Sequence, residues 1–372
     1  MTQKRYCISA GQLFAILFVN RSVIMLTHNT LLGGGENMMD NILSAVLALG
    51  LNFVLILPLY FLHRRNPQEN ILDSGERLVG KPGLILLAVF YGLYFMAIDS
   101  YYLSFFQIFL NNIMEPLMPV WLIALTFIAV VCYAAYQGIE AVARTAGFAL
   151  AIIVIGMVWI GVALLPKIQM INYDPFLYNG PKQTIVGTTL FLARSTGFTT
   201  MALLLPRVTG KKKLKFCIWN VSIYSLMIFL LLGMIGVGGS YLKNQLFPVY
   251  TAASLADAGV LERLDVVFIT IWVAGLFIQM STDAYLFMAC LRKVVNKKVS
   301  RITLPIAASL VAILSITVTR SLPLQKIFYG VPLLFTITVT AAVGIPLVLL
   351  LIDLVRKKKR IPAKTQEGEG EA

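Results

Sequence analysis

Charged and metal-ligating residues are scarce in this chain. Asp, Glu, Lys and Arg together make up 13% of its 372 residues, about half the share found in typical soluble domains. The sequence contains 2 histidines and 4 cysteines, and none of them has the spacing of a metal site. No nucleophile–base pair stands out either. These absences predict that the protein is not an enzyme and binds no metal or other cofactor.

Apolar residues dominate instead. Hydrophobic residues account for 58% of the chain, and the mean hydropathy is +0.82, which is typical of an integral membrane protein. We recognise ten apolar runs long enough to cross a bilayer as helices, at residues 10–32, 41–62, 83–111, 119–137, 142–166, 184–206, 216–240, 265–290, 302–320 and 328–355. The pattern predicts an all-α membrane protein with ten transmembrane helices. They form a single transmembrane domain over residues 1–361, followed by a disordered cytoplasmic tail at 362–372.

The net charge of +14 is arranged as an orientation signal. Most of the 31 Lys and Arg residues lie in alternate connections between the apolar runs, as the positive-inside rule requires. This arrangement places both termini in the cytoplasm and argues against nucleic acid as a partner. The lysine run at residues 211–213 also predicts contact with anionic membrane lipid.

The ten runs divide into two halves of five, at residues 10–166 and 184–355. An odd number of crossings gives the halves opposite orientations, which is the arrangement of an inverted repeat. Such folds carry interrupted helices at corresponding positions in the two halves. Here the first run of each half is the polar one, with Asn20-Arg21-Ser22 in the first and Arg194-Ser195-Thr196-Gly197 in the sixth. We therefore expect a five-plus-five inverted repeat in which helices one and six are broken.

Four charged residues lie well inside apolar runs: Arg21, Asp99, Arg194 and Asp283. Each would cost about 2.5–3.5 kcal/mol at the bilayer centre, so none is expected to face lipid. They fall on runs one, three, six and eight, which surround the central site in five-plus-five transporters. One interpretation is that these runs enclose a water-filled binding pocket. The alternative is that the arginines and aspartates form structural pairs that hold the helices together.

A pocket of this kind would suit a small charged ligand. Arg194 or Arg21 can hold a carboxylate at two points, and a broken helix offers free N–H groups to an anion. Asp99 would either take an ammonium group of the ligand or neutralise Arg21. The predicted ligand-binding residues are Asn20, Arg21, Ser22, Asp99, Tyr102, Arg194, Ser195, Thr196, Gly197, Thr199 and Asp283.

Two further pairs are candidates for gating or coupling. Glu140 and Arg144 are spaced i,i+4 near a cytoplasmic turn, and form either a helix-end pair or an inner gate. Glu262 and Arg263 lie in the outer connection at residues 246–265. This connection either covers the mouth of the site, with a short helix at residues 252–258, or is a plain loop.

Several short motifs together resemble one protein family. The most specific is Phe247-Pro248 followed by residues 261–265, LERLD, and Trp272. Gly138-Ile139-Glu140 with Ala143-Arg144, Leu205-Pro206 before the lysine run, and the opening ISAGQ at residues 8–12 also fit. By these motifs the chain resembles the spore germination permeases, the B-type subunits of nutrient germinant receptors, within the amino acid–polyamine–organocation superfamily. The resemblance covers nearly the whole chain.

This resemblance implies a LeuT-like fold and a sensor rather than a pump. Members of the family lie in the spore inner membrane beside an A-type subunit and a C-type lipoprotein, and they bind a nutrient such as an amino acid. Two rival functions are a secondary transporter for an amino acid or organic cation, and a structural subunit without a ligand. The family's first span usually carries glycine where this chain has Asn20-Arg21-Ser22.

Overall fold

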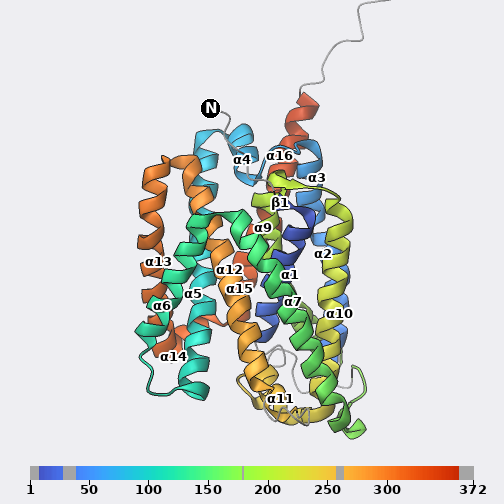
Figure 1. Ribbon diagram of the computed structural model, residues 1–372. Helices are drawn as coiled ribbons and strands as arrows, with labels where there is room; N and C mark the ends of the chain where they lie inside the picture. The colour runs from blue at the N-terminus through green and yellow to red at the C-terminus, as the bar shows by residue number, and fades with distance from the viewer. Residues whose placement is uncertain (1–7, 28–38, 178–179, 257–263, 360–372) are drawn as a thin grey trace, which may run out of the picture.

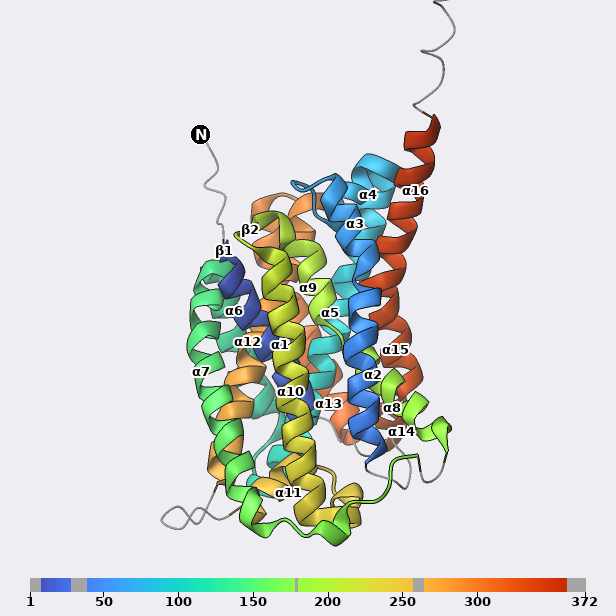
Figure 2. The same cartoon turned by 90° about the vertical axis from the view of Figure 1, so that its right-hand side faces the viewer.

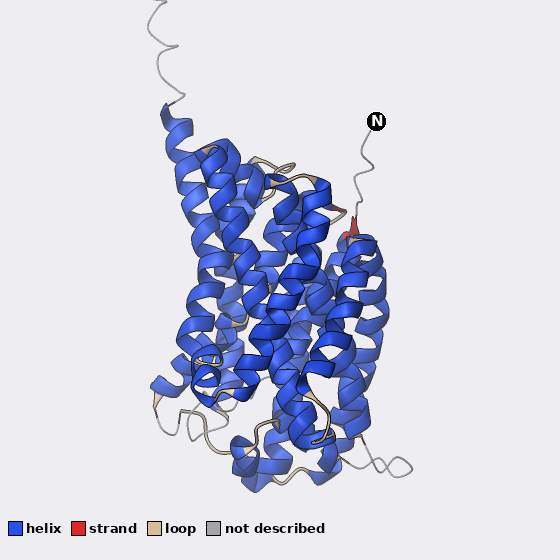
Figure 3. Ribbon diagram, turned by 90° about the vertical axis from the view of Figure 1, so that its left-hand side faces the viewer, coloured by secondary structure: helices blue, strands red, loops and turns tan. Residues whose placement is uncertain are grey.

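The computed structural model describes residues 8–27, 39–177, 180–256 and 264–359. Within these ranges the chain is almost entirely helical, and its long helices lie side by side in an elongated bundle (Figures 1 and 3). The all-α prediction is therefore confirmed. The predicted tail at residues 362–372 and the gate residues Glu262 and Arg263 lie outside the described residues.

The long elements follow the predicted apolar runs closely. They are α1 (Ala10–Thr27), α2 (Asp40–Leu55) continuing into α3 (Leu57–Arg65), α5 (Lys81–Phe109), α6 (Val120–Gln137), α7 (Ile139–Leu164), α8 (Pro181–Ala193) followed by α9 (Gly197–Leu204), α10 (Lys212–Gly238), α12 (Asp265–Val294), α13 (Lys297–Arg320), and α15 (Val331–Val339) leading to α16 (Ile345–Lys359). Eight helical stretches in the described part are long and apolar enough to cross a membrane. The two remaining predicted crossings correspond to the shorter α1 and to the pair α8–α9, and the total of ten stays a prediction.

Short elements join these helices. They are the helices α4 (Ile71–Val79), α11 (Pro248–Leu255) and α14 (Leu322–Phe328), the π-helical turns η1 (Leu110–Met114) and η6 (Thr340–Gly344), the 3₁₀ turns η2 (Leu165–Lys167), η3 (Met170–Asn172), η4 (Leu205–Arg207) and η5 (Gly239–Asn244), and the strands β1 (Ile8–Ser9) and β2 (Val208–Thr209). Gly138 shows how sharply some connections turn. Its φ of 95° is readily adopted only by glycine, and it separates α6 from α7 so that the chain reverses.

The two strands show how the halves of the chain meet. β1 precedes α1 and β2 follows α9, and they pair in parallel with Ile8 opposite Val208. The start of the first crossing and the end of the sixth therefore lie on the same side. Figures 1 and 2 show that β1 and the last turns of α16 lie at this same end of the bundle, whereas α11 lies at the other end. This arrangement agrees with opposite orientations of the two halves. That this end faces the cytoplasm stays a prediction.

Helix α1 occupies the interior of the bundle and packs against α7, α10 and α12. It is continuous from Ala10 to Thr27, so the predicted break at residues 20–22 is wrong. The physical reason lies in the sequence, since no glycine or proline occurs between Gln12 and Thr27. The Ser22 hydroxyl also donates to the carbonyl of Phe18 one turn back, so it adds a bond inside the helix rather than opening it.

The outer connection also differs from its prediction. The short helix expected at residues 252–258 begins earlier, at Pro248, and ends at Leu255. A proline is favoured at the first position of a helix because its nitrogen carries no hydrogen that would need a partner. Helix α11 packs against α12 and α7.

Candidate functional site

The sixth crossing is broken, as predicted. Helix α8 ends at Ala193 and α9 begins at Gly197, with Arg194, Ser195 and Thr196 in a tight turn between them. The turn is closed by the Ser195 amide, which donates to the Leu192 carbonyl at 3.0 Å. All three turn residues are buried. The interruption therefore places backbone polar groups in the interior of the protein, where they need partners.

Arg21 supplies two of these partners. Its Nη1 donates to the carbonyl oxygen of Arg194, and its Nη2 donates to the carbonyl oxygen of Phe191 at 2.9 Å. Carbonyls at the C-terminal end of a helix carry partial negative charge, so a cation is favourable there. Arg21 on α1 thus caps the end of α8. In the described residues no ion pair joins it to an aspartate, so of the two alternatives for Asp99 the structure does not show the one in which it neutralises Arg21.

A polar network extends from this cap. Nη2 of Arg21 also donates to the hydroxyl of Tyr224 at 2.8 Å, and the same hydroxyl accepts a hydrogen bond from Nδ2 of Asn52 at 2.9 Å. Asn52 in turn accepts from the Ser195 hydroxyl and donates to Asn220, both at 3.3 Å. These contacts tie α1, α2 and α10 to the break. Every member of the network is buried.

Arg194 differs from the members of this network. Only 3% of its surface is exposed, yet its Nε and Nη1 have no hydrogen-bond partner among the residues that the structure describes. Its guanidinium is close enough to that of Arg21 for the two charges to repel each other. A buried charge without a partner is strongly unfavourable. The Nε and Nη1 donors of Arg194 therefore remain without an acceptor among the described residues.

The two aspartates form a second group, between α5 and α12. Asp99 is 6% exposed and Asp283 is 2% exposed, and their carboxylates are near enough to repel each other. Asp283 accepts a hydrogen bond from Nε2 of Gln279, whereas Oδ1 of Asp99 has no partner in the described part of the chain. A cavity of about 30 Å³ adjoins Asp99, which is about the space of one water molecule.

Other unpartnered polar atoms come from the elements around these two groups. They belong to Asn20 on α1, Thr196 in the break, Gln279 and Ser281 on α12, and Thr338 on α15. Each buried polar atom without a partner costs about 1–3 kcal/mol, so such atoms usually mark bound water or a ligand. Three helices and the α8–α9 break thus contribute unpartnered polar atoms to the interior of the protein.

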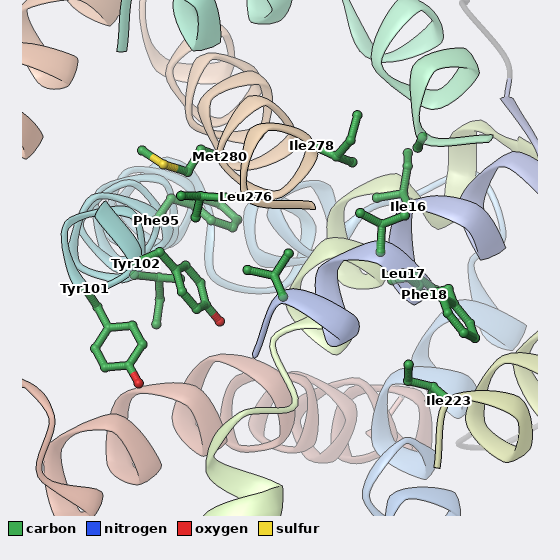
Figure 4. Packing of buried hydrophobic residues seen from close by; sticks show 14 of the residues in the cluster. Ile16, Leu17, Phe18, Phe95, Tyr101, Tyr102, Ile223, Leu276, Ile278 and Met280 are labelled. Atoms are coloured by element: carbon green, nitrogen blue, oxygen red, sulfur yellow. The ribbon is translucent and has the colours of Figure 1, made fainter. Parts of the chain in front are cut away.

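Tyr102 is near a member of each charged group. It is 2% exposed and is within electrostatic range of both Arg21 and Asp283. Figure 4 shows its ring leaning from α5 toward α1, whereas Tyr101 points in another direction. Burial of all four charged residues confirms that none faces lipid. A ligand-binding role for the predicted residues stays a prediction.

The hydroxyl of Thr199 donates a hydrogen bond within the first turn of α9 to the carbonyl of Thr196, at 2.5 Å.

Gly197 packs tightly at the start of α9. A Cβ at Gly197 would lie 3.2 Å from Trp219 and 3.3 Å from Leu17. Gly197→Ala is therefore expected to lower stability by about 1 kcal/mol, because the neighbours must move. The matched control is Gly147→Ala in α7, where nothing lies within 4 Å, and stability should rise slightly. Thermal unfolding in detergent checks both variants, and an equal rise in both would contradict close packing at Gly197.

The predicted gate pairs have different outcomes. Glu140 and Arg144 form an ion pair in the first turns of α7, with 37% and 69% of their side chains exposed. This geometry supports the helix-end pair, and a gating role stays a prediction. Glu262 and Arg263 lie outside the described residues, so their predicted role has no structural counterpart here.

The sequence analysis did not identify the residues that form the hydrogen-bond network around the α8–α9 break. Asn52 and Asn220 are amides within apolar runs, and Tyr224 follows Asn220 by one helical turn. An amide inside a membrane span is a signal that could have marked them. Gln279, four residues before Asp283, could also have been found by its i,i+4 spacing.

The chain resembles known proteins in both sequence and structure. A family model described as "Spore germination protein" matches residues 16–322. No curated protein matches the chain. Among solved structures, one that resembles it is a Na⁺-coupled sialic acid symporter in a substrate-bound outward-open state. It has 11% sequence identity and a TM-score of 0.62, and the match covers 98% of this chain and 94% of that one. At such low identity the similarity concerns the fold alone, and it confirms the predicted LeuT-like fold class.

Proposed function

The chain belongs to the spore germination protein family, and from that premise we propose that it is the nutrient-sensing subunit of a spore germination receptor. It binds a small nutrient, an amino acid, near the bilayer midplane and passes a conformational change to A-type and C-type partner subunits. Its location is the spore inner membrane, with both termini in the cytoplasm. The family match supports the role in germination, and the buried charges support the ligand.

The observation that carries the ligand assignment is the pair of buried guanidinium groups at the α8–α9 break. Arg21 is engaged by two carbonyls and a tyrosine hydroxyl, whereas Arg194 has unpartnered donors. Guanidinium groups bind carboxylates with two parallel hydrogen bonds. A ligand carboxylate at Arg194 would supply the missing partner and offset the repulsion between the two cations. Of the two arginines considered from the sequence, Arg194 is thus the favoured carboxylate anchor.

The aspartates complete the proposed recognition of an amino acid. Asp99 keeps a carboxylate oxygen unpartnered, and a ligand ammonium group is the complementary charge. The 30 Å³ cavity beside Asp99 is lined from α5, α6, α12 and α13 and not from the α8–α9 break, so an amino acid that contacts both Asp99 and Arg194 requires the helices around them to separate. The α8–α9 break is the natural hinge, because interrupted helices move as separate halves in folds of this type. Ligand binding is thereby coupled to a change of shape.

A thermal-shift comparison of matched ligands tests the proposal. Purified protein should be stabilised by an amino acid with a free α-carboxylate, by about 2.7 kcal/mol at a concentration 100 times its Kd. The carboxamide of the same amino acid should give no shift, because it cannot pair with Arg194. Sugars and nucleosides serve as further controls. Equal shifts from the acid and the amide would contradict the carboxylate assignment.

A secondary transporter is the second candidate, because the structural neighbour is a symporter. Reconstituted vesicles separate the two functions. The receptor should bind the labelled amino acid without accumulating it when an ion gradient is imposed. Accumulation that collapses together with the gradient would favour transport.

A further inference from the structure

A large recess opens between α1, α3, α9 and α10, away from the buried charges. Its volume is about 550 Å³, which is within the range of small-molecule sites. Its wall is mostly aliphatic and aromatic, with Leu17 from α1, Phe53 from α2, Met201 from α9 and Phe216 from α10. We name this recess, with its lining residues, the lysine groove.

The rim of the lysine groove carries charge of one sign. Its cations are Arg64, Lys212, Lys213 and Lys215, with His63 beside them, and no Asp or Glu is among its described lining residues. All four of these cations take part in none of the ion pairs that the structure shows between described residues. An occupant with negative charge at this rim would find cations that no acidic side chain of the described chain neutralises.

The rim also lies at the ends of two apolar helices. One helical stretch that is long and apolar enough to cross a membrane ends at Arg65, and another begins at Lys212, so the cations are expected where helices meet lipid headgroups. Figure 2 shows that the first turns of α10 lie at the same end of the bundle as α3 and α4. Lys213 lies over the ring of Tyr60, 5.1 Å from its centroid. Basic residues flanking spans attract anionic lipids.

We propose that the lysine groove binds an anionic phospholipid, with an acyl chain along the apolar wall and the phosphate at the basic rim. The apolar wall excludes a free inorganic anion as the full occupant, and the basic rim disfavours a zwitterionic lipid. The groove wall includes Leu17 on α1 and Leu205 beside the end of α9, and Lys212 already donates to the Leu205 carbonyl at 2.7 Å. A bound lipid therefore holds α9 against α1. The proposal does not depend on the function proposed above.

Cys217 provides a reporter within the groove, since its thiol is free, its side chain is exposed, and it lines the wall. The full-length protein in detergent is treated with N-ethylmaleimide, and labelling of Cys217 is followed by peptide mass spectrometry. Phosphatidylglycerol should slow this labelling at least fivefold, whereas phosphatidylcholine and inorganic phosphate should not. Equal protection by phosphatidylcholine, protection by phosphate alone, or protection by a soluble acidic peptide but not by phosphatidylglycerol would each overturn the proposal.

Charge removal provides the second arm. The triple variant Lys212→Gln, Lys213→Gln, Lys215→Gln should weaken phosphatidylglycerol binding at least tenfold, measured by native mass spectrometry of the retained lipid. The matched control removes three exposed cations at the start of α13, with Lys297→Gln, Lys298→Gln and Arg301→Gln, and should bind as the unchanged protein does. Equal loss in both variants would show a general charge effect and overturn the site. If the triple variant fails to fold, the labelling rate of Cys217 in the unchanged protein still tests the lipid proposal.

Discussion

Replacing Arg21 by alanine is expected to lower the free energy of unfolding by about 3 kcal/mol. The guanidinium donates to the carbonyls of Phe191 and Arg194 and to the hydroxyl of Tyr224, and it lies 5.3 Å from the Tyr224 ring centroid. Its removal leaves two buried carbonyls at the end of α8 without these donors. The loss of repulsion with Arg194 offsets only part of this cost. Thermal unfolding of the purified variant measures the effect.

The location of the destabilised amides distinguishes a capping role of Arg21 from a general packing role. Hydrogen exchange should accelerate in the Arg21→Ala variant at the amides of residues 192–200, with little change in α13. Arg21→Lys should be intermediate, because an ammonium keeps the charge but cannot hold two carbonyls in a planar fork. Tyr224→Phe removes a single contact and should cost about 1 kcal/mol. An Arg21→Ala variant as stable as the unchanged protein, with normal exchange at the break, would refute the capping role.

The burial of the four charges could be predicted from sequence because it depends on a single large term, the free energy of transferring a charge into lipid. Placing a charge in lipid costs several kcal/mol, which exceeds anything that local sequence preferences supply. The same reasoning located the break, since Arg194-Ser195-Thr196 is too polar for an uninterrupted lipid-facing helix. The extent of the long helices follows from hydropathy in the same way.

The partners of those charges could not be predicted from sequence. Whether Arg21 meets a carboxylate or a carbonyl depends on how α1 is rotated and shifted against α8, which lies more than 150 residues away in the chain. The difference in energy between such pairings is only about 1–3 kcal/mol, and no sequence pattern encodes it. The unbroken course of α1 had a visible cause, the absence of glycine and proline. The analogy with folds that break both helices nevertheless led to the opposite expectation.

The buried charges of this protein are therefore separated by sign rather than paired. The arginines gather at the α8–α9 break and the aspartates between α5 and α12, and Tyr102 is within electrostatic range of Arg21 and Asp283. Oppositely charged neighbours would have neutralised each other and given a more stable bundle. Under the proposed function, separation keeps both charges available to a ligand that itself carries both signs. Stability without the ligand and the capacity to bind it would then be in conflict at this site.

Because of this conflict, a change at Arg194 is expected to raise stability while it weakens ligand binding. Arg194→Met is expected to raise the stability of the ligand-free protein by about 1–4 kcal/mol, because an apolar side chain of similar length replaces a buried cation without a full set of partners. The same change should weaken binding of the amino acid about 100-fold, since two charge-assisted hydrogen bonds to its carboxylate are lost. Thermal unfolding and ligand-induced thermal shift measure the two effects on one sample.

Opposite changes in stability and in ligand binding distinguish a binding residue from a structural one. If Arg194 held helices together, Arg194→Met would reduce stability and binding together. If no ligand bound there, stability would rise while spores carrying the variant kept their full response to nutrient. Arg194→Lys should retain part of the binding, because the charge remains but the two-point contact does not. Arg301→Ala, at an exposed position, should change neither property. Only a variant that is more stable and unresponsive agrees with a cation kept unpaired for a ligand.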